Sequence, residues 1–388
     1  MLAVALFCLF IGCIIVQCGY AGYFFVRIFR LKVADEQASE HLEKPVDIPV
    51  SIIICAHNEA SNLSRNLPAI FAQRYKNAGG ERAFEVIVVN DRSTDDTAAV
   101  LAGFKVIFPE LKIVPIDATE ERTLPGNKYP MSKGVAMASH DFLVLTDADC
   151  KPFSDYWISE LMTHFYVSGP HGMITGGYGK LVAASGMLNA FSRWETLHTF
   201  LQYWSYSSRQ KPYMVVGRNL ACRKEALLRA QQSPLWKVTP SGDDDLLVRL
   251  TTDAFKDRRT VFIHPQKNAS TLSEAKTTWG EWLRQKQRHL STGKLYRTEI
   301  QALLAGYAFS HTAAWLLFGA LLLSPFWLYA LVLMSIRCAI YWCIWARVAR
   351  QVDEPGLQYY FPLFDFGWMV YNFALSPFIF WKNKQQWT

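Results

Sequence analysis

A run of apolar residues at the amino terminus places the strongest constraint on how this chain can fold. Residues 2–26 include no charged side chain, and the first charge is that of Arg27. About 20 apolar residues in a helix are enough to cross the hydrocarbon core of a bilayer, which is roughly 30 Å thick. A cleaved signal peptide would have a basic start and a shorter apolar region. We therefore expect residues 1–30 to form a retained transmembrane helix.

The C-terminal part of the chain is also rich in apolar residues. Residues 303–323 and 326–345 predict two membrane spans joined by a tight turn. A last apolar segment, residues 359–380, contains Asp365 and two prolines, so it either spans the membrane or re-enters it. We expect residues 296–388 to form a C-terminal membrane region with two transmembrane helices and this third or re-entrant segment.

Basic residues flank the predicted spans and indicate their orientation. Arg27, Arg30 and Lys32 follow the first span, and Arg347 and Arg350 follow the last complete one. Because cytoplasmic flanks carry an excess of lysine and arginine, these positions predict that the region between the spans is cytoplasmic. In a bacterial cell the protein would then belong to the inner or plasma membrane. Within a span, Arg337 is costly unless it is paired or hydrated.

Charge and cysteine content exclude some other classes of protein. The net charge is +7, but the middle of the chain has no basic arm or aromatic-basic stripe, so we expect no nucleic-acid partner. Attraction to anionic lipid explains the charge of a membrane protein better. The eight cysteines form no C-x-x-C pair, which predicts reduced thiols in a cytoplasmic setting.

The middle of the chain, residues 48–295, follows a predicted linker at residues 31–47 and reads as an α/β domain. Short apolar runs alternate there with segments whose apolar residues recur at helical spacing. The expected strands are residues 50–56, 84–89 and 112–116, and the expected helices are residues 60–73 and 97–104. This alternation predicts a parallel sheet whose ligands bind at the carboxyl ends of the strands.

Polar and acidic residues follow three of the expected strands. His57-Asn58-Glu59 and Asn90-Asp91 come after the first two, and the stretch LVLTDAD ends in Asp147 and Asp149. In an extended segment, residues i and i+2 point to the same side, so a strand can aim both carboxylates at one point. Such a pair suits a divalent cation and, through it, a diphosphate. Alone, a D-x-D is more often a solvated turn.

Three further segments could take part in the same chemistry. Lys133 is expected at a helix start, where a cation could meet phosphate, although it could equally be a solvated lysine. Asp243, Asp244 and Asp245 open another helix, where capping explains one or two acids better than three. Residues 279–297 are dense in Arg, Lys and Trp and predict an interfacial amphipathic helix.

The ordered set of these motifs resembles the membrane-embedded family 2 glycosyltransferases over residues 48–295. The segments that carry the resemblance are HNEASN, VVNDRSTDDT, TDADCKP, GRNLACRKEAL, SGDDDLLVRL and QKQRH. The flanking helices are similar to those of ceramide glucosyltransferases and polysaccharide synthases. The resemblance implies a GT-A fold, that is, a Rossmann-like α/β domain that binds a nucleotide-diphosphate sugar.

The resemblance also implies roles for individual residues. Asp147 and Asp149 match a D-x-D motif that binds Mg or Mn, and Asp243 matches the general base of a T-E-D motif. Asp91 matches the acid that contacts the nucleobase, and Lys133 is expected near the diphosphate. Gln285, Arg288 and His289 match a Q-x-x-R-W motif that closes over the nucleotide sugar. The full set of residues expected to bind the nucleotide sugar is Glu59, Asp91, Lys133, Asp147, Gln285, Arg288 and His289. Two departures are plain: Gly242 replaces the glutamate of T-E-D, and His289 replaces the tryptophan. The first leaves a choice between Asp243 and Asp244, which the following leucines and Arg249-Leu250 resolve in favour of Asp243.

The predicted function is an inverting, metal-dependent transfer of a sugar from a UDP-sugar to a membrane-associated acceptor, expected to be a lipid. A processive polysaccharide synthase is the alternative within this class, but three or four spans are few for a polymer channel. A catalytically silent scaffold or nucleotide-sugar binding protein is an alternative of another class, as is a metal-dependent phosphohydrolase. The sequence does not identify the sugar, the acceptor or the oligomeric state.

Overall fold

The computed structural model describes residues 1–30, 46–255 and 260–375, and these divide into two compact units. The α/β unit contains residues 46–182 and the described part of 212–275, and the helical unit contains residues 1–30, 183–211 and 276–375. The predicted linker lies almost wholly outside the described residues. Residues 183–211 and 276–295 of the predicted domain 48–295 belong to the helical unit, and its other described residues belong to the α/β unit.

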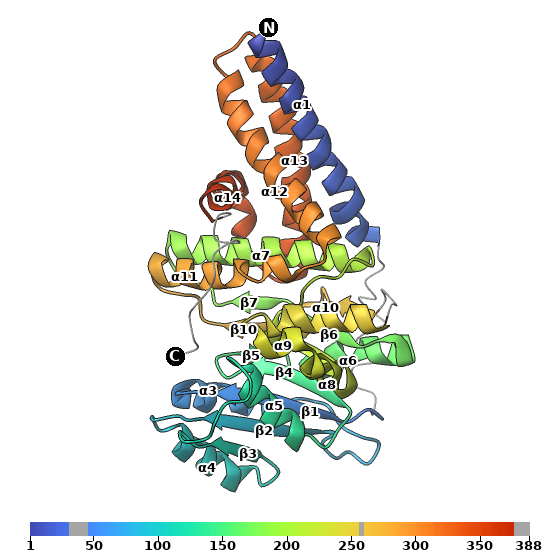
Figure 1. Ribbon diagram of the computed structural model, residues 1–388, viewed down its shortest axis with the longest axis vertical. Coiled ribbons are helices and arrows are strands. Elements are labelled where there is room, and N and C mark those ends of the chain that lie inside the picture. Colours follow the sequence, from blue (N-terminus) through green and yellow to red (C-terminus); the bar gives the residue numbers. More distant parts are fainter. Residues whose placement is uncertain (31–45, 256–259, 376–388) are drawn as a thin grey trace. The chain divides into compact units, whose positions relative to one another are not determined.

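A seven-stranded mixed sheet forms the centre of the α/β unit, with strand order β3-β2-β1-β4-β8-β6-β9 (Figure 1). The first four strands in this order are parallel, as predicted, whereas β8 runs antiparallel to both β4 and β6. The bounds are β1 Val50–Ala56, β2 Phe84–Asp91, β3 Lys112–Ile116, β4 Phe142–Asp147, β6 Ile174–Gly176, β8 Leu220–Arg223 and β9 Val261–Ile263.

Helices cover both faces of this sheet. Side chains alternate along β1, so Ile52 and Ile54 belong to one buried cluster with residues of α3 (Ala60–Phe71), α4 (Thr97–Ile107) and α6 (Trp157–Ser168). On the other face, α5 (Lys128–Met137) approaches β1 so closely that a Cβ atom at Gly134 would lie 2.5 Å from Ile53. Burial on both faces explains the continuous apolar runs of the central strands.

A second, three-stranded sheet has the order β5-β10-β7. Its strands are β5 Lys151–Pro152, β7 Gly179–Leu181 and β10 Thr271–Ser273, and the remaining helices of this unit are α8 Lys224–Gln232, α9 Pro234–Val238 and α10 Asp243–Phe255. The glycine-rich stretch around Gly177 passes from one sheet to the other. A Cβ atom at Gly177 would lie 2.1 Å from the carbonyl oxygen of Ala269, so this crossing requires glycine.

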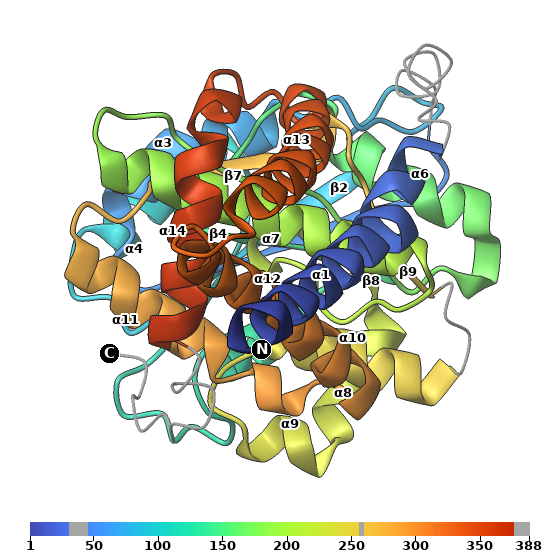
Figure 2. The same cartoon turned by 90° about the horizontal axis from the view of Figure 1, so that it is seen from above.

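Three helices of the other unit are long and apolar enough to cross a membrane: Leu2–Phe25, which begins with α1 (Leu2–Tyr20), α12 (Thr298–Leu321) and α13 (Trp327–Gln351). They lie side by side as a bundle (Figures 1 and 2). Phe7 stacks on Phe326 at 4.7 Å between ring centres, while Gln17 donates to Ser310 Oγ at 2.8 Å, so α1 is antiparallel to α12. The predicted spans are therefore present as helices.

Shorter helices complete the helical unit. They are α7 (Met187–Ser208), α11 (Trp279–Leu290) and α14 (Phe361–Leu375), and α7 and α11 run alongside each other in Figure 1. Helix α14 contains residues 361–375 of the predicted third segment, residues 359–360 lie in the 3-10 turn before it, and residues 376–380 lie outside the described residues. On α14, Asp365 forms a buried ion pair with Arg337 of α13. Arg337 therefore has the charged partner that an arginine within a predicted span was expected to need.

Candidate active site

The carboxyl ends of β2, β1 and β4 lie next to one another at one edge of the large sheet. The pairing registers place Cys55 of β1 opposite Asp147 of β4, and Ala56 opposite Asn90 of β2. The loops beyond β1 and β2 are joined by Asn58, whose side-chain oxygen accepts a hydrogen bond from the backbone N–H of Thr94 at 2.7 Å. The polar segments after three strands therefore meet at one edge, as predicted.

Asp147 ends β4, but Asp149 lies in the turn that follows. The prediction that both aspartates share one extended segment is wrong, because the chain turns after Asp147, where the backbone N–H of Cys150 donates to the Asp147 carbonyl oxygen at 3.1 Å. The turn nevertheless brings a carboxylate oxygen of each aspartate and the Cys150 sulfur within 4.8 Å of one another. The two carboxylates thus converge by a turn instead of by strand alternation.

The chemistry of this group fits a divalent metal ion. Asp147 and Asp149 are exposed and offer the oxygen ligands that Mg²⁺ and Mn²⁺ prefer. The buried Cys150 thiol donates a hydrogen bond to Asp149 Oδ1, with the two atoms 3.1 Å apart. Although Asp147 keeps contact with solvent, the protein around it displaces much of its hydration, and with repulsion from Asp149 this raises the pKa of Asp147 to about 7. A bound cation would favour the ionised carboxylate.

Three aspartates begin α10, as predicted, and they differ in their contacts. The Asp244 carboxylate accepts hydrogen bonds from the backbone N–H groups of Gly217 and Asp245, each at 2.9 Å. Burial and the neighbouring Asp243 raise the pKa of Asp244 to about 6. In the described part of the chain, no group donates a hydrogen bond to the Asp243 side chain. Gly242 has a φ of +75°, and this left-handed backbone favours glycine where the family motif has glutamate.

The aspartates of different elements gather around Cys55, near the end of β1. Burial raises the pKa of the Cys55 thiol, and the negative charges of Asp147, Asp243 and Asp91 raise it further. These carboxylates come from β4, α10 and β2, which are distant in sequence. The structure therefore brings three of the acids selected from the sequence to the same edge of the sheet.

Lys133 does not lie where the sequence suggested. Helix α5 begins five residues earlier, at Lys128, so Lys133 is in its middle. Its ammonium group pairs with Glu120 and lies 5.2 Å from the centre of the Tyr129 ring. The expectation of a lysine at the helix start is wrong for Lys133, because the first residue of the helix is a different lysine.

Lys128 is a buried cation that was not among the residues selected from the sequence. Its Nζ atom donates to the carbonyl oxygens of Trp236 and Thr239, at 3.1 and 2.7 Å. Burial lowers the pKa of Lys128 to about 8, while the charges of Asp243 and Asp244 oppose that shift. Lys128 thus fixes the segment that leads into α10.

Asp91 and Glu59, both expected to bind the nucleotide sugar, have protein partners. The buried Asp91 carboxylate pairs with Arg122 and accepts a hydrogen bond from Arg92 Nε at 3.0 Å. Glu59 accepts a hydrogen bond from Asn62 at 2.6 Å, and burial raises the pKa of Glu59, with the charge of nearby Asp149 adding to that effect. Glu59 therefore lies close to the candidate metal ligand Asp149, and the Asp91 carboxylate is held by two arginines.

The three residues from the expected Q-x-x-R-W motif lie on α11, in the helical unit. Their spacing of three and four residues places Gln285, Arg288 and His289 near one another along the helix surface. The adjacent Lys286 pairs with the buried Glu195 of α7. This ion pair fixes α11 against α7.

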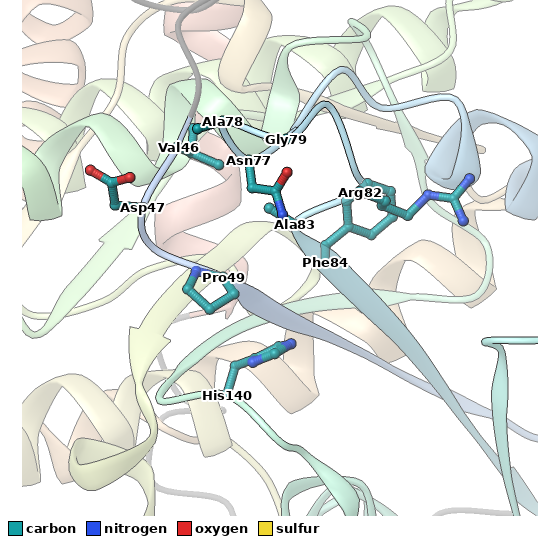
Figure 3. Close-up of a pocket in the computed structure, with 10 residues that line it drawn as sticks. All are labelled: Val46, Asp47, Pro49, Asn77, Ala78, Gly79, Arg82, Ala83, Phe84 and His140. Carbon is teal, nitrogen blue, oxygen red and sulfur yellow. The ribbon is translucent and has the colours of Figure 1, made fainter.

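The α/β unit also has a pocket, shown in Figure 3, at the opposite edge of the sheet. Pro49, Phe84 and His140 line it, and they lie at or before the starts of β1, β2 and β4. Because ligands of parallel sheets bind beyond the carboxyl ends of the strands, this pocket is separate from the candidate site.

Comparison with known families gives two matches. Residues 51–212 match the family described as "Glycosyl transferase family 2", and residues 145–349 match the one described as "Glycosyl transferase family group 2". The second match covers more than half of the chain and includes α12 and most of α13.

Individual relatives are also glycosyltransferases. The chain is 26% identical to glycosyltransferase AglE of Haloferax volcanii over 53% of this chain and 62% of that protein. It is 25% identical to the probable glycosyltransferase YdaM of Bacillus subtilis over 62% of this chain and 54% of that one. The chain therefore spans less than two thirds of the length of either relative.

Among solved structures, the chain is similar to a mannosyltransferase, PcManGT of Pyrobaculum calidifontis, in complex with GDP-Man and Mn²⁺. The TM-score is 0.54 at 17% identity, with 94% of this chain and 99% of that chain covered. At this identity the similarity establishes the GT-A fold alone.

Proposed function

The chain belongs to glycosyltransferase family 2, and we propose that it transfers one sugar from a UDP-sugar to a hydroxyl group of a lipid acceptor in the membrane. The observation that carries this proposal is the convergence of Asp147 and Asp149 at the edge of the sheet that also holds Asp243. A donor site and a base at the same edge are what such a transfer needs.

In the proposed reaction, Asp243 takes the proton of the acceptor hydroxyl. The hydroxyl oxygen forms a bond to the anomeric carbon of the sugar while the bond from that carbon to the diphosphate oxygen breaks. The electron pair of the broken bond leaves with UDP. One base acting opposite the leaving group gives inversion without a covalent sugar-enzyme intermediate. Asp243 is preferred over Asp244 because both carboxylate oxygens of Asp244 accept backbone hydrogen bonds.

Asp147 and Asp149 would hold Mg²⁺ or Mn²⁺, and such an ion neutralises charge on a leaving diphosphate. Glu59 lies near this pair and would contact the donor. Asp91 would contact the nucleotide base, which requires an arginine partner to give way or to share the contact. We assign Gln285, Arg288 and His289 to closure over the nucleotide sugar, on the strength of the motif that they match.

Three helices that are long and apolar enough to span a bilayer support the proposal of a membrane acceptor. The Arg347 guanidinium lies 4.7 Å from the centre of the Phe29 ring, so the end of α13 is next to the segment that follows α1. The end of α13 and the segment that follows α1 therefore lie at the same end of the bundle, and that end would be cytoplasmic by the positive-inside rule.

A processive polysaccharide synthase is a second candidate, supported by one comparison. The chain is 24% identical to a poly-beta-1,6-N-acetyl-D-glucosamine synthase of Staphylococcus epidermidis, over 34% of this chain and 28% of that protein. The number of candidate spans favours single transfer, because a polymer channel needs more helices around a polar pore.

The test incubates the detergent-purified protein with Mn²⁺, a native lipid extract and a panel of UDP-sugars, with GDP-mannose included, followed by mass spectrometry of the lipids. We expect one lipid class to gain the mass of one hexose or N-acetylhexosamine, and the Asp243→Asn variant to give no such product. A ladder of repeated sugar masses would identify the synthase instead. Consumption of no donor by the wild type would refute the transferase.

A further inference from the structure

Arg218 is a positively charged residue at the candidate active site for which no role was expected from the sequence. It lies in the 3-10 turn Gly217–Asn219, directly before β8. Its backbone carbonyl oxygen accepts a hydrogen bond from Thr146 Oγ1 at 2.9 Å, and Thr146 is the residue before Asp147. The position of Arg218 is thus fixed relative to the end of β4.

The guanidinium group of Arg218 is held by a second contact. Its Nη2 atom donates to the carbonyl oxygen of Gly179 at 2.7 Å. The group lies so close to the glycine backbone that a Cβ atom at residue 179 would be 2.6 Å from Nε and 2.9 Å from Nη2. The side chain is therefore oriented by the protein before any ligand binds, which reduces the entropic cost of using it in binding.

This oriented guanidinium group still has donors to offer. Nε is buried without a partner, and no described residue accepts a hydrogen bond from Nη1. Arg218 is close enough to Asp147 for its charge to oppose the rise in the pKa of that carboxyl group, yet no ion pair joins the two side chains in the described part of the chain. Arg218 therefore lies near Asp147 with hydrogen-bond donors that no described residue uses.

We propose that Arg218 binds the diphosphate of the nucleotide-sugar donor beside the Asp147–Asp149 pair. This inference rests on the proposed function and deepens it. Arginine suits the task because its guanidinium group is always charged and offers several N–H donors to phosphate oxygens. As the bond from the anomeric carbon to the diphosphate oxygen breaks, the electron pair moves onto UDP, and Arg218 stabilises that added charge. The family resemblance implied a place near the diphosphate for Lys133, whose ammonium group pairs with Glu120 in the structure.

Binding of UDP to the full-length, detergent-purified protein tests the proposal by calorimetry with Mn²⁺ present, with GDP titrated in parallel. We expect Arg218→Gln to weaken UDP binding by about tenfold or more, the effect of losing one charge-assisted hydrogen bond. Uridine, which lacks the phosphates, should compete with UDP in the variant as it does in the wild type. Arg229→Gln is the matched control, because Arg229 is exposed and contacts Glu225 within α8 and the ring of Phe255, neither of which belongs to the candidate site.

A second variant displaces the Arg218 guanidinium group without removing it. Gly179→Ala keeps Arg218 but pushes the end of its flexible side chain away, so it should also weaken UDP binding. Gly103→Ala is its control, because a Cβ atom there meets nothing within 4 Å. If Arg218→Gln does not fold, Gly179→Ala decides the question. Unchanged UDP affinity in whichever of these variants folds would overturn the role of Arg218 alone, whereas a wild type that binds neither UDP nor GDP would refute the proposed function.

Discussion

The Asp244 carboxylate accepts a hydrogen bond from the backbone N–H of Gly217, and this contact joins the start of α10 to the loop before β8. The same loop accepts the hydrogen bond from Thr146, next to Asp147. The proposed base, Asp243, and the proposed metal ligands are therefore linked through one short loop. Asp244 acts in this arrangement as a positioning residue, which leads to different expectations for the two neighbouring aspartates.

Asp243→Asn should abolish sugar transfer and leave UDP binding within about twofold of the wild type, since a general base contributes about 10²- to 10⁴-fold to the rate. Asp244→Asn should keep measurable transfer but lower the midpoint of thermal unfolding, because one amide oxygen cannot replace both carboxylate oxygens in their backbone hydrogen bonds. Initial rates and calorimetry on both variants check this. If Asp244→Asn were the inactive variant and Asp243→Asn the active one, the base would be Asp244.

Mn²⁺ affinity should depend on pH through Asp147, whose pKa is raised to about 7. Below that pH a proton occupies the carboxylate and competes with the metal, so affinity is lost as pH falls through 7 and is fully present above it. A group with this pKa is about one tenth ionised at pH 6 and about nine tenths ionised at pH 8. We therefore expect the Mn²⁺ affinity to be about tenfold weaker at pH 6 than at pH 8. Electron paramagnetic resonance of free Mn²⁺ measures this directly. Constant affinity across that range would rule out Asp147 as the titrating ligand.

Lys128→Met should destabilise the α/β unit by about 1–3 kcal/mol, because it removes the donor for two carbonyl groups that lead into α10. Lys128→Arg tests whether a guanidinium group can replace the ammonium group as the donor to these two carbonyl groups. Denaturant unfolding followed by tryptophan fluorescence measures the change, since Trp236 lies 4.7 Å from the Lys128 Nζ atom. Stability equal to the wild type would show that these carbonyl groups find other donors.

The fold was predictable from the sequence wherever local pattern and burial agree. The strands at residues 50–56 and 112–116 were predicted with the observed bounds, because each is a short run rich in valine and isoleucine. A strand entering a helix was expected near Leu220, but the antiparallel direction of β8 was not predicted, since strand direction depends on partners that are distant in sequence. Likewise, Asp147 and Asp149 were recognisable as a pair, but the turn that brings them together was not.

The cations of the site were the least predictable part. Lys128 and Lys133 belong to one short segment, and no local signal says which of them is buried. Contacts with Trp236 and Thr239, more than a hundred residues away, settle that for Lys128. Arg218 has its position from Gly179 and Thr146, which the sequence does not place beside it.

Four helices of the helical unit meet at the ion pair between Arg337 of α13 and Asp365 of α14. Arg337 Nη2 also donates to Gln17 Oε1 of α1 at 3.1 Å, and His311 of α12 lies 3.3 Å from Asp365 Oδ1. Trp315 of α12 donates to Asp365 Oδ2 at 3.0 Å. The Asp365 carboxylate therefore joins α14 to both α12 and α13.

Removing one member of this pair should therefore cost more than removing both. Asp365→Leu leaves a buried, unpaired arginine and should destabilise the helical unit by about 3–5 kcal/mol, whereas Arg337→Met combined with Asp365→Leu should recover most of that loss. Unfolding in mixed detergent micelles measures both. Arg350→Met is the control, because Arg350 is exposed near the end of α13. If the double variant were as unstable as the single one, the stability of the bundle would come from the hydrogen bonds to Gln17, His311 and Trp315 and not from the charge pair.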